Sequence, residues 1–165
     1  MNHSTYVNWG GHPIKLTWIP SKSLPNLEKV TSVHGYCFHE GKLLLVLIKD
    51  RGYNVPGGHI EPGESPEATL LREAHEEGYV KGNSSFIGML EVSHEENPHF
   101  DPLGKYPLIG YQLFYRMDID EVLPFQREYE SIARIWVEPD QLPYVIDDHE
   151  LSALILKEAM LVRLP

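Results

Sequence analysis

The residues of this chain that could do chemistry are gathered in one acidic stretch, in which Glu73, Glu76 and Glu77 follow Arg72. On a helix of about 3.6 residues per turn, positions i, i+3 and i+4 share an arc of roughly 100°. Carboxylates at this spacing repel one another and weaken an isolated helix. Hard divalent cations prefer oxygen ligands and would relieve that repulsion. The spacing therefore favours a metal site, although a merely solvated acidic helix face has the same pattern.

The helix that must position these acids has a clear predicted start. Ser65 is a good N-cap, and Pro66 suits the first helical position. The side of the helix roughly opposite the acids is apolar, at Ala68, Leu71 and Ala74. One face can then pack on a core while the other stays free for a site. Before the helix, Gly57 and Gly58 allow the loop to fold back over it.

The same residues resemble the box of the Nudix hydrolases, G-x5-E-x7-R-E-U-x-E-E-x-G-U, where U is a bulky apolar residue. The positions in register are Gly58, Glu64, Arg72, Glu73, Glu76, Glu77 and Val80. We take residues 57–80 as the box. One position departs from the pattern, because Tyr79 stands where the final glycine is expected. We therefore predict that Gly78 or Gly82 makes the exit from the helix.

The resemblance implies an α/β/α sandwich with a mixed β-sheet, in which the box forms a loop–helix–loop motif. It also implies Mg²⁺- or Mn²⁺-dependent hydrolysis of a diphosphate linkage, in a nucleoside diphosphate derivative or a (d)NTP. The implied ligands are the carbonyl of Gly57 and the carboxylates of Glu73, Glu76 and Glu77. Arg72 is implied as a catalytic-site residue that braces Glu73 or a neighbouring carboxylate, with contact to phosphate as the alternative.

Nudix hydrolases often use one more glutamate, placed shortly before a strand that contains tryptophan. Glu128 and Glu130 both precede Trp136. Glu130 lies six places before the tryptophan, which is the better spacing, so we predict it as a catalytic and metal-binding residue. Glu128 remains the alternative, because in an extended segment it points to the same side.

Substrate contacts are predicted at three positions. His59 directly follows the two glycines and could touch a phosphate, whereas Tyr53 and Tyr106 could stack on a base or sugar. His94 and Phe100 are further stacking candidates. Tyr106 belongs to a long loop, 95–107, which either shapes a binding pocket or is an ordinary surface loop.

The 165 residues are enough for a single α/β domain. Residues 1–28 are predicted to be irregular, with a short edge strand at most over 15–19, and tryptophans 9 and 18 are expected to anchor the segment to the core. A C-terminal helix is predicted over 147–162, capped by Asp147 with Glu150. Strands are predicted over 29–38, 42–49, 85–94, 108–117 and 132–137, with a turn at Glu40 and Gly41.

Composition narrows the partners. A net charge of −10 argues against long nucleic acid, and we expect a small phosphorylated substrate instead. The lone Cys37 lies in an apolar run and is expected to be a buried thiol in a reducing cytoplasm. No signal peptide or membrane segment is expected, and the oligomeric state, monomer or homodimer, stays open. The alternative functions are a ligand sensor without hydrolysis, an RNA 5′-end pyrophosphohydrolase, and a prenyl diphosphate isomerase, which would need a cysteine.

Overall fold

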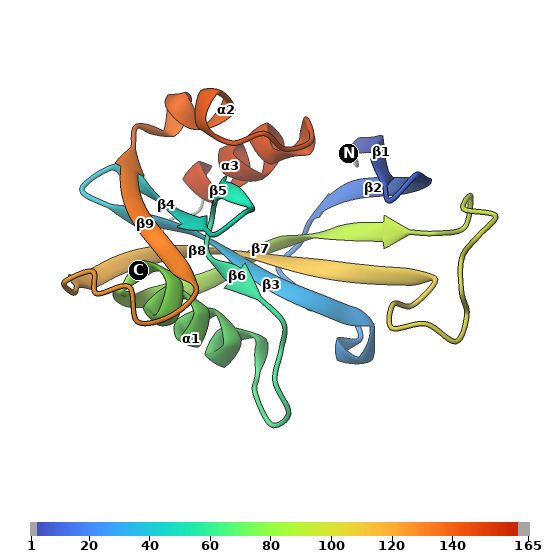
Figure 1. Cartoon of the computed structure of the whole chain (residues 1–165), viewed down its shortest axis with the longest axis horizontal. Coiled ribbons are helices and arrows are strands. Elements are labelled where there is room, and N and C mark those ends of the chain that lie inside the picture. Colours follow the sequence, from blue (N-terminus) through green and yellow to red (C-terminus); the bar gives the residue numbers. More distant parts are fainter. Residues whose placement is uncertain (1–2, 162–165) are drawn as a thin grey trace.

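The computed structural model describes residues 3–161 and shows one mixed sheet with helices on both faces (Figure 1). The strands are β1 (His3–Trp9), β2 (His12–Pro20), β3 (Val30–His39), β4 (Lys42–Ile48), β5 (Gly52–Asn54), β6 (Gly57–Gly58), β7 (Val80–Ser93), β8 (Ile109–Val122) and β9 (Ser131–Val137). The α-helices are α1 (Pro66–Gly78), α2 (Leu142–Val145) and α3 (Leu151–Leu161), and short 3-10 turns lie at Leu27–Lys29 and Pro139–Gln141. The predicted α/β fold is confirmed.

The strands of this described part are ordered β1-β2-β7-β8-β3-β4-β5, with β6 paired to β3 and β9 paired to β4. The β3–β8 pair is parallel and the other pairs are antiparallel, which makes the sheet mixed. The central strands are therefore far apart in sequence but adjacent in space. The first half of β3 lies next to the glycines of the box, which pair with Val33 and His34.

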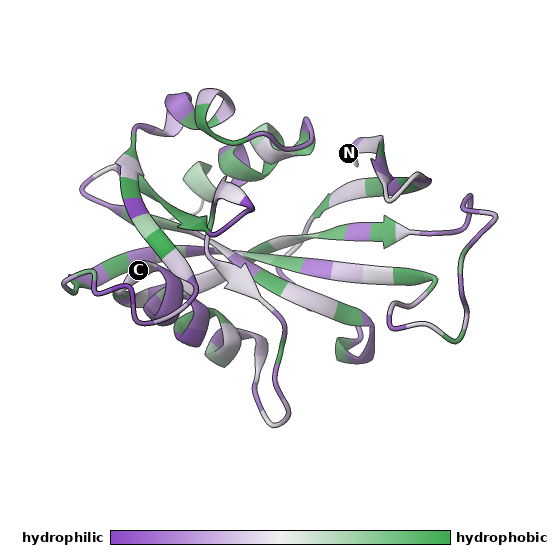
Figure 2. Ribbon diagram, viewed as in Figure 1, coloured by the Kyte–Doolittle hydropathy of each residue, from purple (hydrophilic) through white to green (hydrophobic). Residues whose placement is uncertain are grey.

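Two hydrophobic cores lie on opposite faces of the sheet. One is covered by α3 and the other by α1. Strand β4 serves both, because Leu43 and Leu45 enter the first core while Leu44 and Val46 enter the second. This alternation is the strand period of two, so the strand predicted over 42–49 is buried on both sides. Figure 2 shows apolar stretches along the central strands and hydrophilic residues along α1.

The box helix begins as predicted and ends differently. The Ser65 hydroxyl accepts a hydrogen bond from the N–H of Ala68 at 3.1 Å, and Pro66 is the first helical residue. The helix ends at Gly78, and the left-handed exit residue is Tyr79, with φ 56° and ψ 44°. The prediction that a glycine makes this exit was wrong. The tyrosine is held in that conformation by its side chain, which is 5% exposed and packs under the β8–β9 segment.

The prediction of an irregular segment over 1–28 was also wrong. β1 and β2 form a hairpin around Gly10 and Gly11, both with positive φ, and β2 also pairs with β7, so it is not an edge strand. Alternate residues of β2, ending in Trp18, are buried. This alternation covers more residues than the stretch that was predicted as a strand. Trp18 is an anchor as expected, whereas Trp9 is 42% exposed.

The C-terminal helix is shorter than predicted. α3 starts at Leu151, and the predicted end at position 162 lies outside the described residues. Asp147 does not cap it, because residues 146–149 run as a loop and the carbonyl of His149 accepts the N–H and hydroxyl of Ser152. No helix within residues 3–161 has the length and apolarity needed to cross a membrane.

Candidate active site

An acidic cleft of about 330 Å³ lies between α1 and the segment that joins β8 to β9. It brings together every predicted catalytic side chain. Its lining residues are Glu61, Arg72, Glu73, Glu76, Glu77, Tyr129 and Glu130. Glu130 therefore lies in the cleft beside the box acids, while Glu128 is not part of the lining. The Glu128 N–H instead donates to the hydroxyl of Tyr79 at 2.8 Å.

Arg72 is the hub of this cleft. Its Nε and Nη2 donate to the two oxygens of Glu64 at 2.7 and 3.0 Å, a forked pair. Its Nη1 donates to Glu73 Oε1 at 2.8 Å and lies 3.6 Å from Glu76 Oε2. The structure thus shows Arg72 holding carboxylates, which is the first of its two predicted roles.

Glu64 closes the loop onto the helix. Its Oε1 accepts the N–H of Glu61 at 2.9 Å and the hydroxyl of Thr69 at 3.1 Å. The hydrogen bonds from Arg72, followed by the one from the Glu61 N–H, lower the pKa of Glu64 to about 2. The carboxylate is therefore charged at any pH at which the protein would work, and the loop stays tied to α1.

The two glycines of the loop must be glycines for steric reasons. A Cβ at Gly57 would collide with the ring of His34, and one at Gly58 would collide with the carboxylate of Glu73. Both residues also pair with β3, opposite His34 and Val33. The Gly57 N–H donates to Glu77 Oε1 at 2.8 Å. The loop backbone thus lies directly against two of the three helix acids.

The cleft holds more negative charge than Arg72 can balance. Burial raises the pKa of Glu77 to about 8; the bond from the Gly57 N–H opposes the rise, and the charges of Glu73 and Glu130 add to it. Burial also raises the pKa of Glu73, although Arg72 opposes the shift. Glu73 and Glu77, whose charged forms are disfavoured, share this small cleft with the carboxylates of Glu76 and Glu130. Such an arrangement stabilises a bound cation.

The oxygen donors of the cleft are of the chemical kind that binds a hard divalent ion, but they are not arranged as a complete metal site. Within residues 3–161 no three His, Cys, Asp or Glu side chains are already arranged to hold a metal. Glu73 is engaged by Arg72, and Glu77 by the Gly57 N–H. The four carboxylates nevertheless line one cleft, and oxygen donors of this kind are what Mg²⁺ and Mn²⁺ prefer.

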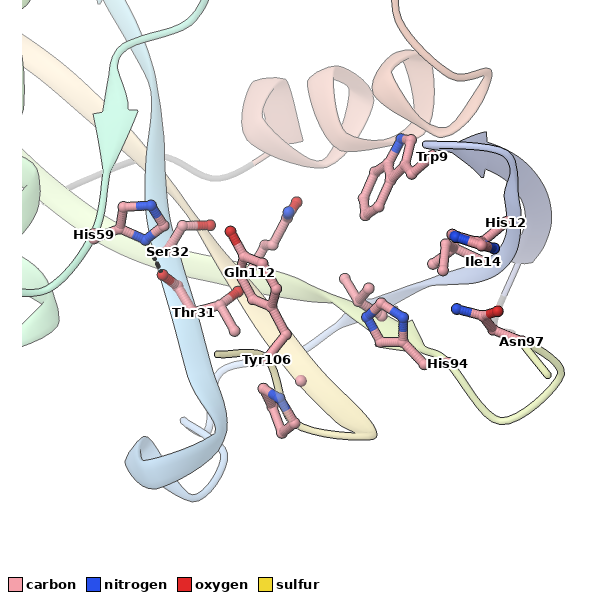
Figure 3. A pocket seen from close by; sticks show the side chains of 13 residues that line it. Trp9, His12, Ile14, Thr31, Ser32, His59, His94, Asn97, Tyr106 and Gln112 are labelled. Atoms are coloured by element: carbon pink, nitrogen blue, oxygen red, sulfur yellow. Dashed lines mark hydrogen bonds between the residues drawn. The ribbon is translucent and has the colours of Figure 1, made fainter. Parts of the chain in front are cut away.

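A second cavity, of about 300 Å³, lies beside the cleft and is shown in Figure 3. It is lined by Trp9, His12, Ile14, Thr31, Ser32, His59, Val92, His94, Asn97, Tyr106, Pro107, Gly110 and Gln112. Two of the three predicted substrate contacts, His59 and Tyr106, therefore share one cavity. Tyr53 does not line it, because it lies on β5 and packs against the core beneath α3.

His59 stands at the boundary between the cleft and this cavity. Its Nδ1 lies 2.7 Å from the carbonyl oxygen of Thr31, and its own carbonyl accepts Nη2 of Arg72 at 3.1 Å. One residue of the glycine loop thus contacts the hub of the cleft through its backbone and lines the cavity with its ring.

A deeper hollow of about 200 Å³ continues from the cavity, with Trp9 and Gln112 lining both. His149, whose side chain is only 10% exposed, lines this hollow, and its Nδ1 is buried without a hydrogen-bond partner among the described residues. Buried polar atoms are rarely left unpaired. This nitrogen is therefore a candidate contact for a polar group of a ligand. His34 also lines the hollow, and burial lowers its pKa to about 4.

Several residues that line the cavity and the hollow were not predicted from the sequence. Trp9, His12, Gln112 and His149 come from two hairpin strands, a central strand and the loop before α3. None belongs to a spaced motif, and they meet only because β2 pairs with β7 and β7 with β8. The long loop after β7 contributes His94, Asn97 and Tyr106, so it does shape a pocket.

A glycine loop that leads into an acidic helix beside a mixed sheet is the arrangement expected of a Nudix domain. The family model of that domain matches residues 29–157, and the chain therefore belongs to the Nudix family. A candidate 8-oxo-dGTP diphosphatase of Bacillus subtilis (strain 168), YtkD, is 29% identical over 126 residues, which make up 76% of this chain and 72% of that protein.

Solved structures share the fold. The Bacillus subtilis pyrophosphohydrolase BsRppH, crystallised as an E68A mutant, superposes with a TM-score of 0.71 at 22% identity, over 96% of each chain. An ADP-ribose pyrophosphatase of Streptococcus suis superposes with a TM-score of 0.54 at 20% identity, over 80% of this chain and 92% of that one. The N-terminal hairpin lies outside the family match.

Proposed function

We propose that this chain hydrolyses a diphosphate linkage in a nucleoside triphosphate or another nucleoside diphosphate derivative, with Mg²⁺ or Mn²⁺. One observation carries the proposal: Glu73, Glu76, Glu77 and Glu130 line one cleft from two separate segments of the chain. A solvated acidic helix face would not need a fourth acid from the β8–β9 segment. Family membership supports the same reaction class.

The metal ligands we propose are the carboxylates of Glu73, Glu76, Glu77 and Glu130, together with the carbonyl of Gly57. When bound, the ion would screen the charge of the diphosphate and lower the pKa of the attacking water. Arg72 fixes the Glu73 carboxylate through its hydrogen bond. Gly58 leaves the space that the Glu73 carboxylate occupies.

The proton of the attacking water needs an acceptor in the same cleft. Glu130 is exposed to solvent in the lining, whereas Glu77 is 7% exposed and its pKa is raised to about 8. We assign Glu130 to proton transfer or metal binding, since it can exchange protons with bulk water. Glu77 serves better as a buried ligand, because burial favours its pairing with a cation.

The substrate's nucleoside is proposed to occupy the cavity on the far side of His59. Aromatic and imidazole rings flank that space, and two of them, those of Trp9 and Tyr106, are half-exposed. Flat faces of this kind stack on nucleobases with little regard for sequence. The unpaired Nδ1 of His149 would then meet a polar edge of the base in the deeper hollow. The phosphates would extend past His59 into the acidic cleft.

Formation of the hydrolysis products with Mg²⁺, separated by chromatography, tests the proposal over dGTP, 8-oxo-dGTP, ADP-ribose, a dinucleoside polyphosphate, a nucleotide sugar and 5′-triphosphorylated RNA. We expect cleavage of at least one nucleotide, lost on chelation of the metal and in Glu77→Gln. Tight calorimetric binding of these ligands with no cleavage of any of them would favour a sensor instead.

One alternative loses support and one stays in the screen. The side chain of Cys37 is 0% exposed, and burial raises its pKa to about 12, so it cannot act as the acid or base of an isomerase. Cleavage at an RNA 5′ end uses the same diphosphate chemistry. The net charge of −10 disfavours a long polyanion, and the triphosphorylated RNA in the panel decides between the two.

A further inference from the structure

Tyr79 combines two features that seldom occur together. Its backbone is left-handed, with φ 56°, and its side chain is almost fully buried. A left-handed backbone is unfavourable for a residue with a Cβ, and glycine would remove that cost. The position is also the one where the box pattern has glycine. A tyrosine held here against that cost therefore needs a reason in its contacts.

The contacts of Tyr79 reach along the segment that joins β8 to β9. Its hydroxyl accepts the N–H of Glu128 at 2.8 Å. Its ring packs edge-on against Phe125, with centroids 5.0 Å apart, and lies 6.3 Å from the ring of Tyr129. Its carbonyl accepts the N–H of Leu123 at 2.8 Å. One residue thus binds the segment at its start, its middle and next to Glu130.

The neighbouring carbonyls at the end of α1 are tied to the same part of the chain. The Ser131 hydroxyl donates to the carbonyl of Glu77 at 2.7 Å. Nη1 of Arg134 donates to the carbonyls of Gly78 and Leu123, at 3.0 and 2.9 Å. Free carbonyls at a helix end need such partners. Here the partners, Ser131 and Arg134, lie on β9 directly after the segment that carries Glu130, so the end of the helix is bonded to the chain on that side of the segment as well.

We propose that Tyr79 is a positioning residue that holds the β8–β9 segment so that Glu130 faces Glu73, Glu76 and Glu77 across the cleft. The Glu130 side chain is exposed, so its place depends on the backbone that carries it. The Tyr79 hydroxyl bonds the backbone two residues before it. This inference rests on the proposed function for the role of Glu130, but the tether itself does not.

The tether is tested without activity, by amide hydrogen exchange on the metal-free protein. Tyr79→Phe keeps the ring and removes only the hydroxyl, so we expect the Glu128 amide to exchange about fivefold faster or more. Tyr115→Phe is the matched control, because its hydroxyl lies 2.9 Å from Glu67 Oε1 at the opposite end of the same helix. That control should leave the Glu128 amide unchanged. Unchanged exchange in Tyr79→Phe overturns the proposal.

The positioning role is tested by a double-mutant cycle with Glu130→Gln, using the panel substrate that is cleaved fastest. Tyr79→Phe should lower kcat about fivefold and leave KM within about twofold. In the Glu130→Gln background the same change should have no further effect, since coupled residues do not act additively. A purely structural tyrosine would cost the same factor in both backgrounds, and that result overturns the proposal.

Tyr79→Gly sharpens the comparison. Glycine relieves the left-handed backbone but also removes the buried ring and its contacts. We expect faster exchange over residues 123–130 and a larger loss of kcat than in Tyr79→Phe. Full turnover in Tyr79→Gly would overturn the proposal. A different result would be full turnover in Glu130→Gln while hydrogen exchange confirms the tether. That result would reject the assigned role of Glu130, and the tether would then have no catalytic residue to position.

Discussion

The acidic cleft and the cavity beside it differ in how the chain encodes them. Five of the seven cleft residues come from one short stretch, 61–77, and only two come from elsewhere. The cavity draws on the N-terminal hairpin, β3, the glycine loop, the loop after β7, and β8. The cleft therefore depends mainly on the spacing of residues within one short stretch. The cavity forms only when strands that are distant in sequence pair with one another.

The two regions also differ in chemistry. The cleft is lined by carboxylates around one guanidinium, and the cavity by imidazoles, aromatic rings and amides. A carboxylate cluster suits a cation and the phosphates that a cation attracts. Flat rings suit a base. Changes in the cleft should therefore alter kcat, and changes in the cavity should alter KM and the choice of substrate.

The largest expected effect is at the helix acids. Glu76→Gln or Glu77→Gln should lower kcat about a hundredfold or more, because each removes a charged oxygen donor from the reacting region. The rate of product formation under saturating substrate measures it, with circular dichroism as the check on folding. Glu121→Gln, an exposed acid on β8, is the control and should keep its activity. Near-normal rates in both cleft variants would reject the assignment of the cleft.

The next largest effect is an increase in KM when Trp9, in the lining of the cavity, is replaced. Trp9→Ala should raise KM about tenfold with kcat nearly unchanged, because loss of one base-stacking ring typically costs about 1–3 kcal/mol of binding. Tyr144→Ala removes an aromatic ring that is 90% exposed and does not line the cavity, so it should leave KM unchanged. If Trp9→Ala lowers kcat and spares KM, the division between cleft and cavity fails.

A smaller effect is expected deeper in the cavity. His149→Phe keeps a flat ring and removes the unpaired Nδ1, so KM for the preferred nucleotide should rise about fivefold. The rise should be smaller for nucleotides with a different base edge, measured as a change in the ratio of kcat/KM values. His39→Phe changes a histidine outside the cavity and should leave the ratio as it was.

The smallest effect concerns pH and stability. The pKa of Glu77 is raised to about 8 in the folded chain, above its usual value of 4.5. The fold therefore favours the neutral acid, and its stabilisation is present below about pH 4.5 and is lost as the pH rises through 8. In the presence of a chelator, urea titrations at pH 8 should give Glu77→Gln a free energy of unfolding that is higher than that of the wild type by roughly 1–4 kcal/mol, with little gain at pH 5. A larger gain at pH 5 would contradict this sign.

Sequence reasoning reached the cleft because its information is local. The spacing of Arg72, Glu73, Glu76 and Glu77 alone places the side chains on one side of a helix. Glu130 was predicted because it lies six positions before Trp136. The fold class followed from the same resemblance, and strand β4 lies within the strand predicted over 42–49. These features need no knowledge of which strands pair.

The cavity and the chain ends were out of reach for the opposite reason. Trp9 was expected to be an anchor, yet it lines a cavity because β1 and β2 extend the sheet beside β7. Tyr79 broke the glycine rule because contacts with Phe125 and Glu128, about fifty residues away, outweigh a local backbone preference. Tertiary contacts of this kind override propensity and leave no trace in spacing.

The half-exposed indole of Trp9 also gives the protein a built-in optical reporter. Of the chain's three tryptophans, Trp18 is 2% exposed in the core under α3, and Trp136 packs against the opposite core. Only Trp9 lines the cavity. A ligand that stacks there should quench and shift the emission of one indole over a constant background from the other two. Nucleotide affinity can then be followed by intrinsic fluorescence, in variants that no longer turn over and without any label.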